Sequence, residues 1–348
     1  ISGQTAFIVG QVGTVDINGD QIATVTGTNT FTVPRNCLAG GGTGGTVTGR
    51  AAFSIAPATW NQRPSGDDIT NPPPPIIRDN GTIGGTKSFR DIAFTRERLV
   101  LAGDSWVITS QAGDTFNLWI DDAANVVASD PVQIQVASQE AIDLDYLVPI
   151  RRSILAFTRN GRQFDISSDA EVFSQANVRV TPITKLTTLP VRPDTIDPIV
   201  YAAAANDASA QLHEIVYDDI NLPTTAEDVT SHVRDLIFLK KPSNGQNATI
   251  RTIATSPQNG IVVVGRTSFN TNSAKMQDLF LYSSLFRGDA KVQSAWTRIS
   301  FDGDHGIHDF IVIGNDLYLL RGHVLGGTYT TFLEKMSLSP ESSHRVTE

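Results

Sequence analysis

The chain has 348 residues, of which 40% are hydrophobic and 18% charged, and its formal net charge is −9. The length allows one large β domain or two smaller domains, and the acidic balance argues against a surface that wraps nucleic acid through clustered Lys and Arg. The only cysteine, Cys37, excludes an intrachain disulfide and a cysteine-based zinc site.

The sequence contains no run of roughly 18 apolar residues, so no membrane-spanning segment is expected. The first residues, ISGQTAFIVG, contain neither an initiator Met nor a basic segment, and they predict no signal peptide. The missing Met indicates a processed or truncated part of a longer product. A lone cysteine is compatible with assembly in a reducing cytoplasm.

Residues 1–60 are rich in Gly and Thr, carry few charges and predict a small β segment that could belong to a platform domain. Asn18-Gly19 lies between alternating apolar positions, which predicts a two-residue β-hairpin near residues 12–25. Residues 38–49 (LAGGGTGGTVTG) are too glycine-rich for a regular strand and lack the spacing of a phosphate-binding loop. They predict a plain loop.

Four consecutive prolines, Pro72–Pro75, favour polyproline II geometry and predict a semi-rigid connector over residues 61–85. After it, residues 86–330 contain short β-type runs separated by turn residues. Hairpin turns are predicted at Asn160-Gly161 and at Gly314-Asn315-Asp316. The main body of the chain is therefore predicted to be an antiparallel β-meander.

The expected fold class is mainly β: a β-propeller-like antiparallel meander with the small Gly/Thr-rich segment appended. Antiparallel strands must close or cover their edges, which a propeller does, and a pair of β-sandwiches is the alternative. One short helix is predicted at residues 223–234, where Thr225 could cap it and Glu227-Asp228 suit a helix N-terminus. Residues 331–348 are expected to form a C-terminal strand and tail.

One stretch, FDGDHGIHDF, has residue types that could hold a divalent metal: Asp302, Asp304, His305, His308 and Asp309. Gly303 and Gly306 interrupt it, and Asp and Gly are ordinary turn formers, so a turn is the favoured interpretation and no metal or other cofactor is predicted. Asp16, Asn18 and Asp20 match the first positions of a calcium-binding loop. The glycine and the distal glutamate that such a loop requires do not stand at the expected positions.

Pairs of acidic residues could serve glycoside hydrolysis if two of them converged across a cleft: Asp121-Asp122, Asp143 with Asp145, and Asp218-Asp219. Such pairs in an acidic protein are usually solvated loop residues. The histidines, including His213 and His232, have no GxSxG or HExxH pattern near them. The sequence therefore predicts no catalytic residues and no enzyme.

The block from Arg90 to Pro131 resembles the tail tubular protein B, or nozzle, family of short-tailed phages. The family pattern falls here on Arg96, Arg98, Leu99, Ser110, Asp114, Phe116, Asn117, Trp119, Asp130 and Pro131. Three further stretches agree in order: residues 60–72 (WNQRPSGDDITNP), 226–232 (AEDVTSH) and 291–301 (KVQSAWTRISF), the last of which contains Trp296.

The same residues have a physical interpretation. Large apolar anchors, namely Trp106, Phe116, Trp119 and Trp296, are expected in the core, where they would pin neighbouring sheets. Arg96 and Arg98, two residues apart on one strand, would share a face and could fork onto a carboxylate such as Asp114.

The resemblance implies a homohexameric tube below the portal and adaptor ring, in the virion tail, which is assembled in the host cytoplasm, conducts double-stranded DNA during ejection and helps attach tail fibres. Six copies at −9 each bring about −54, and an acidic lumen would let DNA slide without sticking. The rival hypotheses are a carbohydrate-binding or carbohydrate-cleaving phage tail propeller and a monomeric propeller scaffold that binds protein partners.

Overall fold

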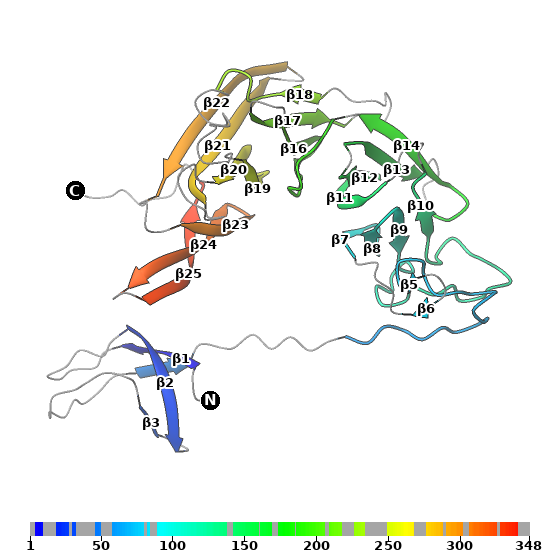
Figure 1. Cartoon of the computed structure of the whole chain (residues 1–348), viewed down its shortest axis with the longest axis horizontal. Helices are drawn as coiled ribbons and strands as arrows, with labels where there is room; N and C mark the ends of the chain where they lie inside the picture. Colours follow the sequence, from blue (N-terminus) through cyan, green and yellow to red (C-terminus); the bar gives the residue numbers. More distant parts are fainter. Residues whose placement is uncertain are drawn as a thin grey trace, which may run out of the picture. The chain divides into compact units, whose positions relative to one another are not determined.

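The computed structural model describes residues 4–9, 19–27, 30–32, 46–49, 58–79, 82–83, 89–137, 142–159, 161–168, 173–184, 186–205, 209–217, 226–233, 249–267, 276–287, 290–301, 306–325 and 328–339. The chain divides into two compact units, Ile1–Thr59 and Trp60–Glu348. Figure 1 shows both units as antiparallel β-structure.

The first unit contains one four-stranded antiparallel sheet in the order β3-β2-β1-β4. Its strands are β1 (Gln4–Val9), β2 (Gly19–Gly27), β3 (Thr30–Thr32) and β4 (Thr46–Gly49). Two predictions are corrected here. Gly19 pairs with Ile8, so the hairpin joins β1 to β2 instead of turning at Asn18-Gly19. The last part of the predicted glycine-rich loop is strand β4, since Thr46–Gly49 pair with β1.

The second unit contains three successive four-stranded meanders and a seven-stranded sheet. Sheet 1 consists of β7 (Asp91–Thr95), β8 (Arg98–Gly103), β9 (Trp106–Thr109) and β10 (Gln133–Gln135). Sheet 2 consists of β11 (Leu144–Ile150), β12 (Ser153–Thr158), β13 (Gln163–Ser168) and β14 (Val178–Thr184). Sheet 3 consists of β15 (Asp194–Ile196), β16 (Ile199–Ala205), β17 (Ala210–Val216) and β18 (Ala226–Asp228).

The seven-stranded sheet combines two smaller meanders. Strands β19 (Ile250–Ser256), β20 (Ile261–Thr267), β21 (Met276–Arg287) and β22 (Ala290–Ser300) form the first, and β23 (Ile307–Ile313), β24 (Asp316–Leu325) and β25 (Thr328–Ser337) form the second. In the described backbone, the two meanders pair at Met276–Ile307 of β21 and β23. A two-stranded hairpin of β5 (Arg78–Asp79) and β6 (Thr82–Ile83) precedes sheet 1.

The second hairpin turn predicted in the body is confirmed, and the first is confirmed at Gly161, whereas Asn160 lies outside the described residues. Thr158 and Arg162 close the first around Gly161, which has a φ of 86° that glycine adopts without steric cost. In the second, Ile313 pairs with Asp316 across a two-residue loop that begins at Gly314 with a φ of 63°.

Apolar side chains fill the space between consecutive sheets. Strand β12 shows why its sequence SILAFT is a continuous buried run, since every one of its residues is buried. Ile154 and Ala156 pack in the cluster shared with sheet 1, whereas Leu155 and Phe157 pack in the cluster shared with sheet 3. A strand covered on both faces loses the polar–apolar alternation of a half-exposed strand.

The next interface in chain order is built in the same way. Tyr201 and Leu212 of sheet 3 pack with Val262 and Tyr282 of the seven-stranded sheet.

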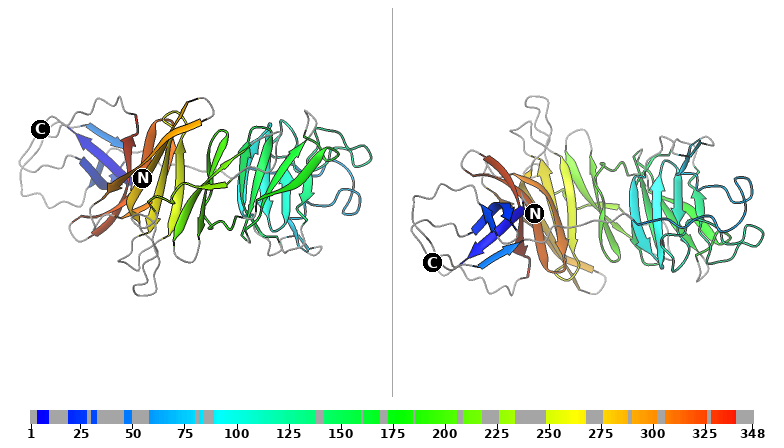
Figure 2. Two further views of the ribbon diagram at one scale, coloured as in Figure 1. Left: turned by 90° about the horizontal axis from the view of Figure 1, so that it is seen from above. Right: turned by 90° about the horizontal axis from the view of Figure 1, so that it is seen from below.

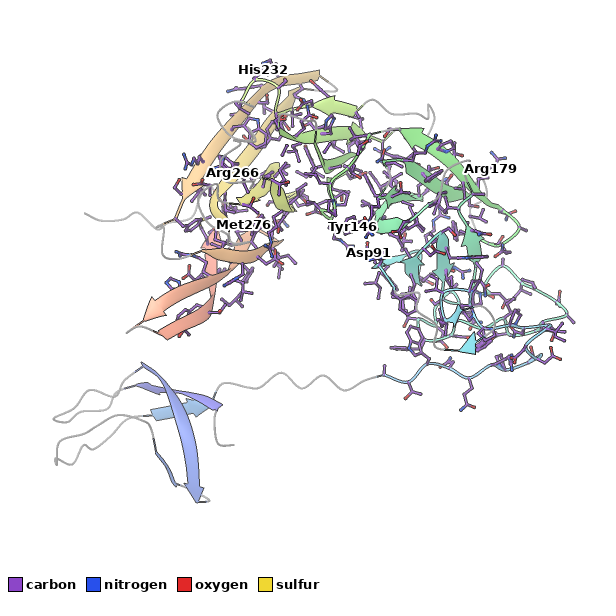
Figure 3. All side chains as sticks on the ribbon, in the orientation of Figure 1. Asp91, Tyr146, Arg179, His232, Arg266 and Met276 are labelled. Carbon is purple, nitrogen blue, oxygen red and sulfur yellow. The ribbon has the colours of Figure 1, made fainter. Side chains whose placement is uncertain are left out.

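A polar contact joins sheets 1 and 2, because the amide of Leu147 donates to Asp91 Oδ2 at 2.8 Å. Figure 3 shows Asp91 on β7 close to Tyr146 on β11.

The helix predicted at residues 223–234 is wrong. Residues 226–228 form strand β18, which pairs with β17 through His213–Asp228, and a turn follows at residues 229–233. Tertiary pairing overrides a weak local helix signal. The mainly-β prediction is confirmed, since the described residues form strands and turns but no helix, as Figure 2 shows in two further views. Among these residues there is accordingly no helix long and apolar enough to cross a membrane.

Candidate functional site

Nine of the ten residues singled out from the sequence lie in one region of sheet 1. It consists of the β7–β8 turn, the start of β8 and the segment 110–132, which links β9 to β10. The nine are Arg96, Arg98, Ser110, Asp114, Phe116, Asn117, Trp119, Asp130 and Pro131. The tenth, Trp296, lies apart on β22.

Arg98 is the centre of this region and is almost fully buried, with 3% of its surface exposed. Its Nη1 donates to the carbonyl oxygens of Ser110 at 2.7 Å and Asp130 at 2.8 Å. Its Nη2 donates to those of Ala128 at 2.7 Å and Phe173 at 3.3 Å. Burial lowers the pKa of Arg98, and the charge of Asp130 opposes that shift. One guanidinium therefore ties four backbone positions to β8.

Ser110 fixes the start of the linking segment against β8. Its amide donates to the carbonyl of Leu99 at 2.8 Å, and its Oγ accepts from the amide of Leu99 at 3.0 Å. Both polar groups of this buried serine are thus used locally, which is what a buried position requires.

Asp114 and Phe116 attach the segment around Trp60 to the same region. Asp114 Oδ1 accepts from the amide of Phe116 at 3.0 Å, and its Oδ2 accepts from Asn61 Nδ2 at 2.7 Å. The rings of Trp60 and Phe116 meet edge to face at 5.9 Å. The predicted motif residues here serve a loop-to-loop contact.

Asn117 and Trp119 stabilise the next turn. Asn117 Oδ1 accepts from the amide of Trp119 at 2.9 Å, and Asn117 Nδ2 donates to Gln111 Oε1 at 2.7 Å. The guanidinium of Arg63 lies over the Trp119 ring, 5.2 Å from its centre. At the far end of the segment, Asp130 Oδ2 accepts from the amide of Val127 at 2.8 Å, immediately before the buried Pro131.

Two expectations about these residues are wrong. Arg96 and Arg98 do not share a strand face, because Arg96 lies in the turn before β8, and neither donates to Asp114 among the described contacts. Phe116 is not in the core, since 42% of its surface is exposed. Trp106, Trp119 and Trp296 are only partly buried. Phe116 contacts Trp60, which is itself 45% exposed, so this aromatic pair lies at the surface instead of in the core.

Trp296 has a separate position. It packs on Tyr282 with ring centres 5.0 Å apart, and its Nε1 donates to the carbonyl of Val229 at 3.2 Å. This contact joins β22 to the turn that follows β18, so Trp296 contributes to the packing of sheet 3 on the seven-stranded sheet.

The acidic pairs within the described residues have structural partners. Asp143 and Asp145 both bind Arg159, at 3.2 Å and 2.9 Å. Asp121 accepts from Gln111 at 2.7 Å, and Asp122 accepts from the amide of Ala124 at 2.9 Å. Asp218-Asp219 lie outside the described residues.

The stretch whose residue types could hold a divalent metal is only partly described. His308 and Asp309 lie on β23, where Asp309 Oδ1 accepts from Thr252 Oγ1 at 3.0 Å, whereas Asp302, Asp304 and His305 lie outside the described residues. The other calcium candidates belong to the first unit, where Asp20 is in β2 and Asp16 and Asn18 are outside the described residues. The part of the chain that the structure describes holds no group of three or more His, Cys, Asp or Glu placed to bind a metal.

Sequence reasoning missed a buried charge cluster between sheet 3 and the seven-stranded sheet. Glu214 on β17, only 2% exposed, contacts Lys291 on β22, and Lys291 Nζ lies 3.4 Å from the hydroxyl of Tyr282. Burial lowers the pKa of Lys291, but the hydrogen bond and charge of Glu214 outweigh it and the pKa is raised. Burial and Glu214 both raise the pKa of Tyr282. The sequence feature that could have indicated this cluster is Glu214, a charged residue within the largely apolar strand AQLHEIV.

The chain is similar to known proteins in both sequence and structure. A relative, the tail tubular protein gp12 of Escherichia phage T7, is 23% identical over 282 residues, which cover 80% of this chain and 32% of the relative. The chain thus spans about a third of that relative's length.

Three solved structures align with low TM-scores. The N-terminal domain of Nup159 has a TM-score of 0.37 at 6% identity, with 73% of this chain and 62% of that chain covered. Hsv2p of Kluyveromyces lactis has a TM-score of 0.37 at 8% identity, with 74% and 75% covered. The Pan2 WD40 domain of Neurospora crassa has a TM-score of 0.32 at 12% identity, with 67% and 61% covered.

The match to a family model is more extensive. The model of the bacteriophage nozzle protein matches residues 46–348, which include sheet 1 with its Arg98-centred loop, sheets 2 and 3 and the seven-stranded sheet. The chain belongs to the bacteriophage nozzle protein family.

Proposed function

We propose that the chain is a structural, non-enzymatic subunit of a phage tail that assembles as a homohexameric tube below the portal and adaptor ring. The tube conducts double-stranded DNA during ejection and helps attach tail fibres. The observation that carries this proposal is the nozzle family match over residues 46–348. The same role is consistent with the relationship to a tail tubular protein of phage T7.

The sheet arrangement fits a propeller-like body for this subunit. Sheets 1, 2 and 3 are each a four-stranded meander in sequence order, and apolar clusters join each sheet to the next. Successive meanders that pack face to face are the building pattern of β-propellers. A propeller-like body is therefore part of the proposal.

An exposed apolar face on the last meander supports assembly into a larger structure. Leu320 and Leu333 are cross-strand neighbours on β24 and β25, with exposed fractions of 40% and 71%. Ile311 and Ile313 on β23 lie on the same face and are also exposed. Asp309, Asp316 and Lys335 stand between these positions on the same face. Exposed apolar side chains bordered by polar residues commonly mark a protein interface.

Electron microscopy of the chain with portal and adaptor proteins of the same phage tests the proposal. We expect a six-fold tube continuous with the portal channel. Leu333→Asp is expected to abolish the tube, whereas Ile69→Asp, at a position 88% exposed outside this face, should assemble normally. A wild-type chain that stays monomeric in the presence of both proteins would refute the nozzle role.

The net charge of the chain provides a second test of the proposed DNA passage. Six copies at −9 each bring about −54 to the assembly, so a lumen lined by Asp and Glu would repel DNA phosphates and keep the genome from adhering. Replacing lumen-facing carboxylates with Lys should slow ejection, and added salt should restore the rate because it screens the new attraction. Unchanged kinetics at low salt would contradict the electrostatic part of the proposal.

A further inference from the structure

A cationic cavity lies where the β7–β8 turn of sheet 1 meets the β11–β12 turn of sheet 2. Its volume is about 530 Å³, and its lining residues are Arg96, Arg98, Ala112, Ala128, Ser129, Arg152 and Phe173. Three arginines thus line one cavity in a protein whose overall charge is negative. Arg98 holds backbone carbonyls of the loop, whereas no carboxylate among the lining residues balances the charges of Arg96 and Arg152.

The turn that presents Arg96 has an unusual backbone. Thr95 pairs with Arg98, and the two residues between them, Arg96 and Glu97, have φ angles of 50° and 60°. A two-residue hairpin turn of this kind normally carries Asn-Gly, because other residues pay a steric cost at positive φ. Strained residues persist where the surrounding structure requires them, and they gather at ligand sites.

One buried donor of Arg96 meets no acceptor within the described part of the chain. Its Nη2 donates to the carbonyl of Arg152 at 2.7 Å, and its guanidinium lies 5.7 Å from the centre of the Phe173 ring. Its Nη1 is buried and has no hydrogen-bond partner among the residues that the structure describes. A buried donor left unsatisfied costs roughly 1–3 kcal/mol, so an acceptor placed in this cavity would remove an existing penalty.

The charges around the cavity also favour an anion. The acceptors of Arg98 are backbone carbonyl oxygens and the Thr109 hydroxyl, which carry no net charge, and the charge of Asp130 acts on it. Asp130 Oδ2 is already bonded to the amide of Val127. Burial lowers the pKa of Arg96, and the like charge of Arg152 lowers it further. The described residues that line the cavity thus include three arginines and no carboxylate.

We propose that this cavity binds a carboxylate, supplied by an Asp or Glu side chain of another protein chain, with Arg96 and Arg152 as the direct ligands and Arg98 as a fixed positive charge behind them. A guanidinium fork matches a planar carboxylate. Phe173, Ala112 and Ala128 provide apolar walls for the methylene groups of such a side chain. The site is independent of the proposed tail function, since it requires only these residues.

Titration of the full chain at low ionic strength tests the proposal, with the arginines labelled by ¹⁵N and the Nε–Hε resonance of Arg96 as the readout. The probes are glutarate, inorganic phosphate and two short capped peptides that differ only in a central Glu or Gln. We expect saturable shifts with glutarate and with the Glu peptide, and affinity for the Glu peptide roughly tenfold above that for the Gln peptide.

Variants assign the binding to this cavity. Arg96→Gln should abolish the response to the Glu peptide, as monitored on the Arg98 resonance, and Arg152→Gln should weaken it at least several-fold if the first variant fails to fold. The matched control is Arg298→Gln, which removes the same charge from β22 and should bind like the wild type.

Three results would overturn the proposal. The first is the absence of a saturable shift with any probe. The second is phosphate that binds roughly tenfold more tightly than the Glu peptide, which would make this a phosphate site. The third concerns Asp169 and Glu171, which precede Phe173 in the sequence and lie outside the described residues. If only the double variant Asp169→Asn, Glu171→Gln binds the peptide, the chain's own carboxylates occupy the cavity.

Discussion

The carboxylate of Glu214 on β17 and the ammonium of Lys291 on β22 form a buried ion pair that joins sheet 3 to the seven-stranded sheet. Lys291 donates to Glu214 Oε2, whereas the buried Oε1 has no hydrogen-bond partner among the described residues. Breaking a buried pair from one side is costly because the remaining charge stays in a medium of low polarity.

Lys291→Met is therefore expected to lower the free energy of unfolding by about 3–5 kcal/mol. The double variant Glu214→Met, Lys291→Met should recover most of that loss, because two apolar side chains of similar volume replace both charges. Urea denaturation of the single and double variants measures the difference. A single variant within about 1 kcal/mol of the wild type would show that water reaches Glu214.

Arg98→Met should lower the free energy of unfolding by about 3–5 kcal/mol, because the carbonyls of Ser110, Ala128 and Asp130 lose a buried donor. The matched control is Arg298→Met. Arg298 has a side chain that is 59% exposed, and its partner Asp278 keeps Arg266 at 3.0 Å. The control is expected to cost less than about 1 kcal/mol in the same denaturation experiment. Equal losses in both variants would contradict a special role for Arg98.

Gly161→Ala and Gly113→Ala separate steric overlap from backbone strain. Both glycines have positive φ angles, 86° and 79°. A Cβ on Gly161 would lie 2.8 Å from Thr187 Oγ1 and 2.9 Å from Thr187 Cα, whereas a Cβ on Gly113 would meet nothing within 4 Å. Thermal unfolding should show a loss of about 1 kcal/mol for Gly113→Ala and about 3 kcal/mol for Gly161→Ala. Similar losses would mean that Thr187 moves away at little cost.

His213 should make the fold sensitive to acid. Burial lowers the pKa of His213 below 6.5, and the charge of Asp228 opposes that shift only in part. The unfolded chain then binds a proton at a higher pH than the folded chain does, so stability is complete above about pH 6.5 and falls as the pH drops toward the folded pKa.

His213→Gln should flatten this part of the pH profile, measured by urea unfolding between about pH 7.5 and 5. The exposed His232, labelled in Figure 3, provides the control, and His232→Gln is expected to leave the profile as it is in the wild type. A profile that keeps its slope in His213→Gln would assign the acid sensitivity to other groups.

Local turn chemistry made part of the fold predictable. The turn that contains Gly161 was predictable because this glycine supplies a positive φ, and the body was correctly assigned to β-structure from its short β-branched runs. The turn at Arg96-Glu97 was missed because neither residue is a usual turn former at positive φ. Residues 226–228 were misassigned to a helix because pairing with β17, a tertiary contact, decides their conformation.

The bonding of the site was not predictable from the sequence. The motif residues from Arg96 to Pro131 lie in one region of sheet 1. The partners of Arg98 are backbone carbonyls, however, and a carbonyl is the same at every residue, so no sequence pattern could identify them. The sequence suggested a carboxylate such as Asp114 as the partner of Arg98, but Asp114 accepts a hydrogen bond from Asn61.

The four carbonyl bonds of Arg98 have a dynamic consequence. A loop held by separate local bonds opens piece by piece, and its amide hydrogens exchange with solvent at many different rates. Here Ser110, Ala128 and Asp130 share one donor group, so releasing any of them disturbs the others. Hydrogen exchange across residues 110–130 should therefore proceed as one cooperative opening, with sheet 1 and this loop behaving as a single folding unit.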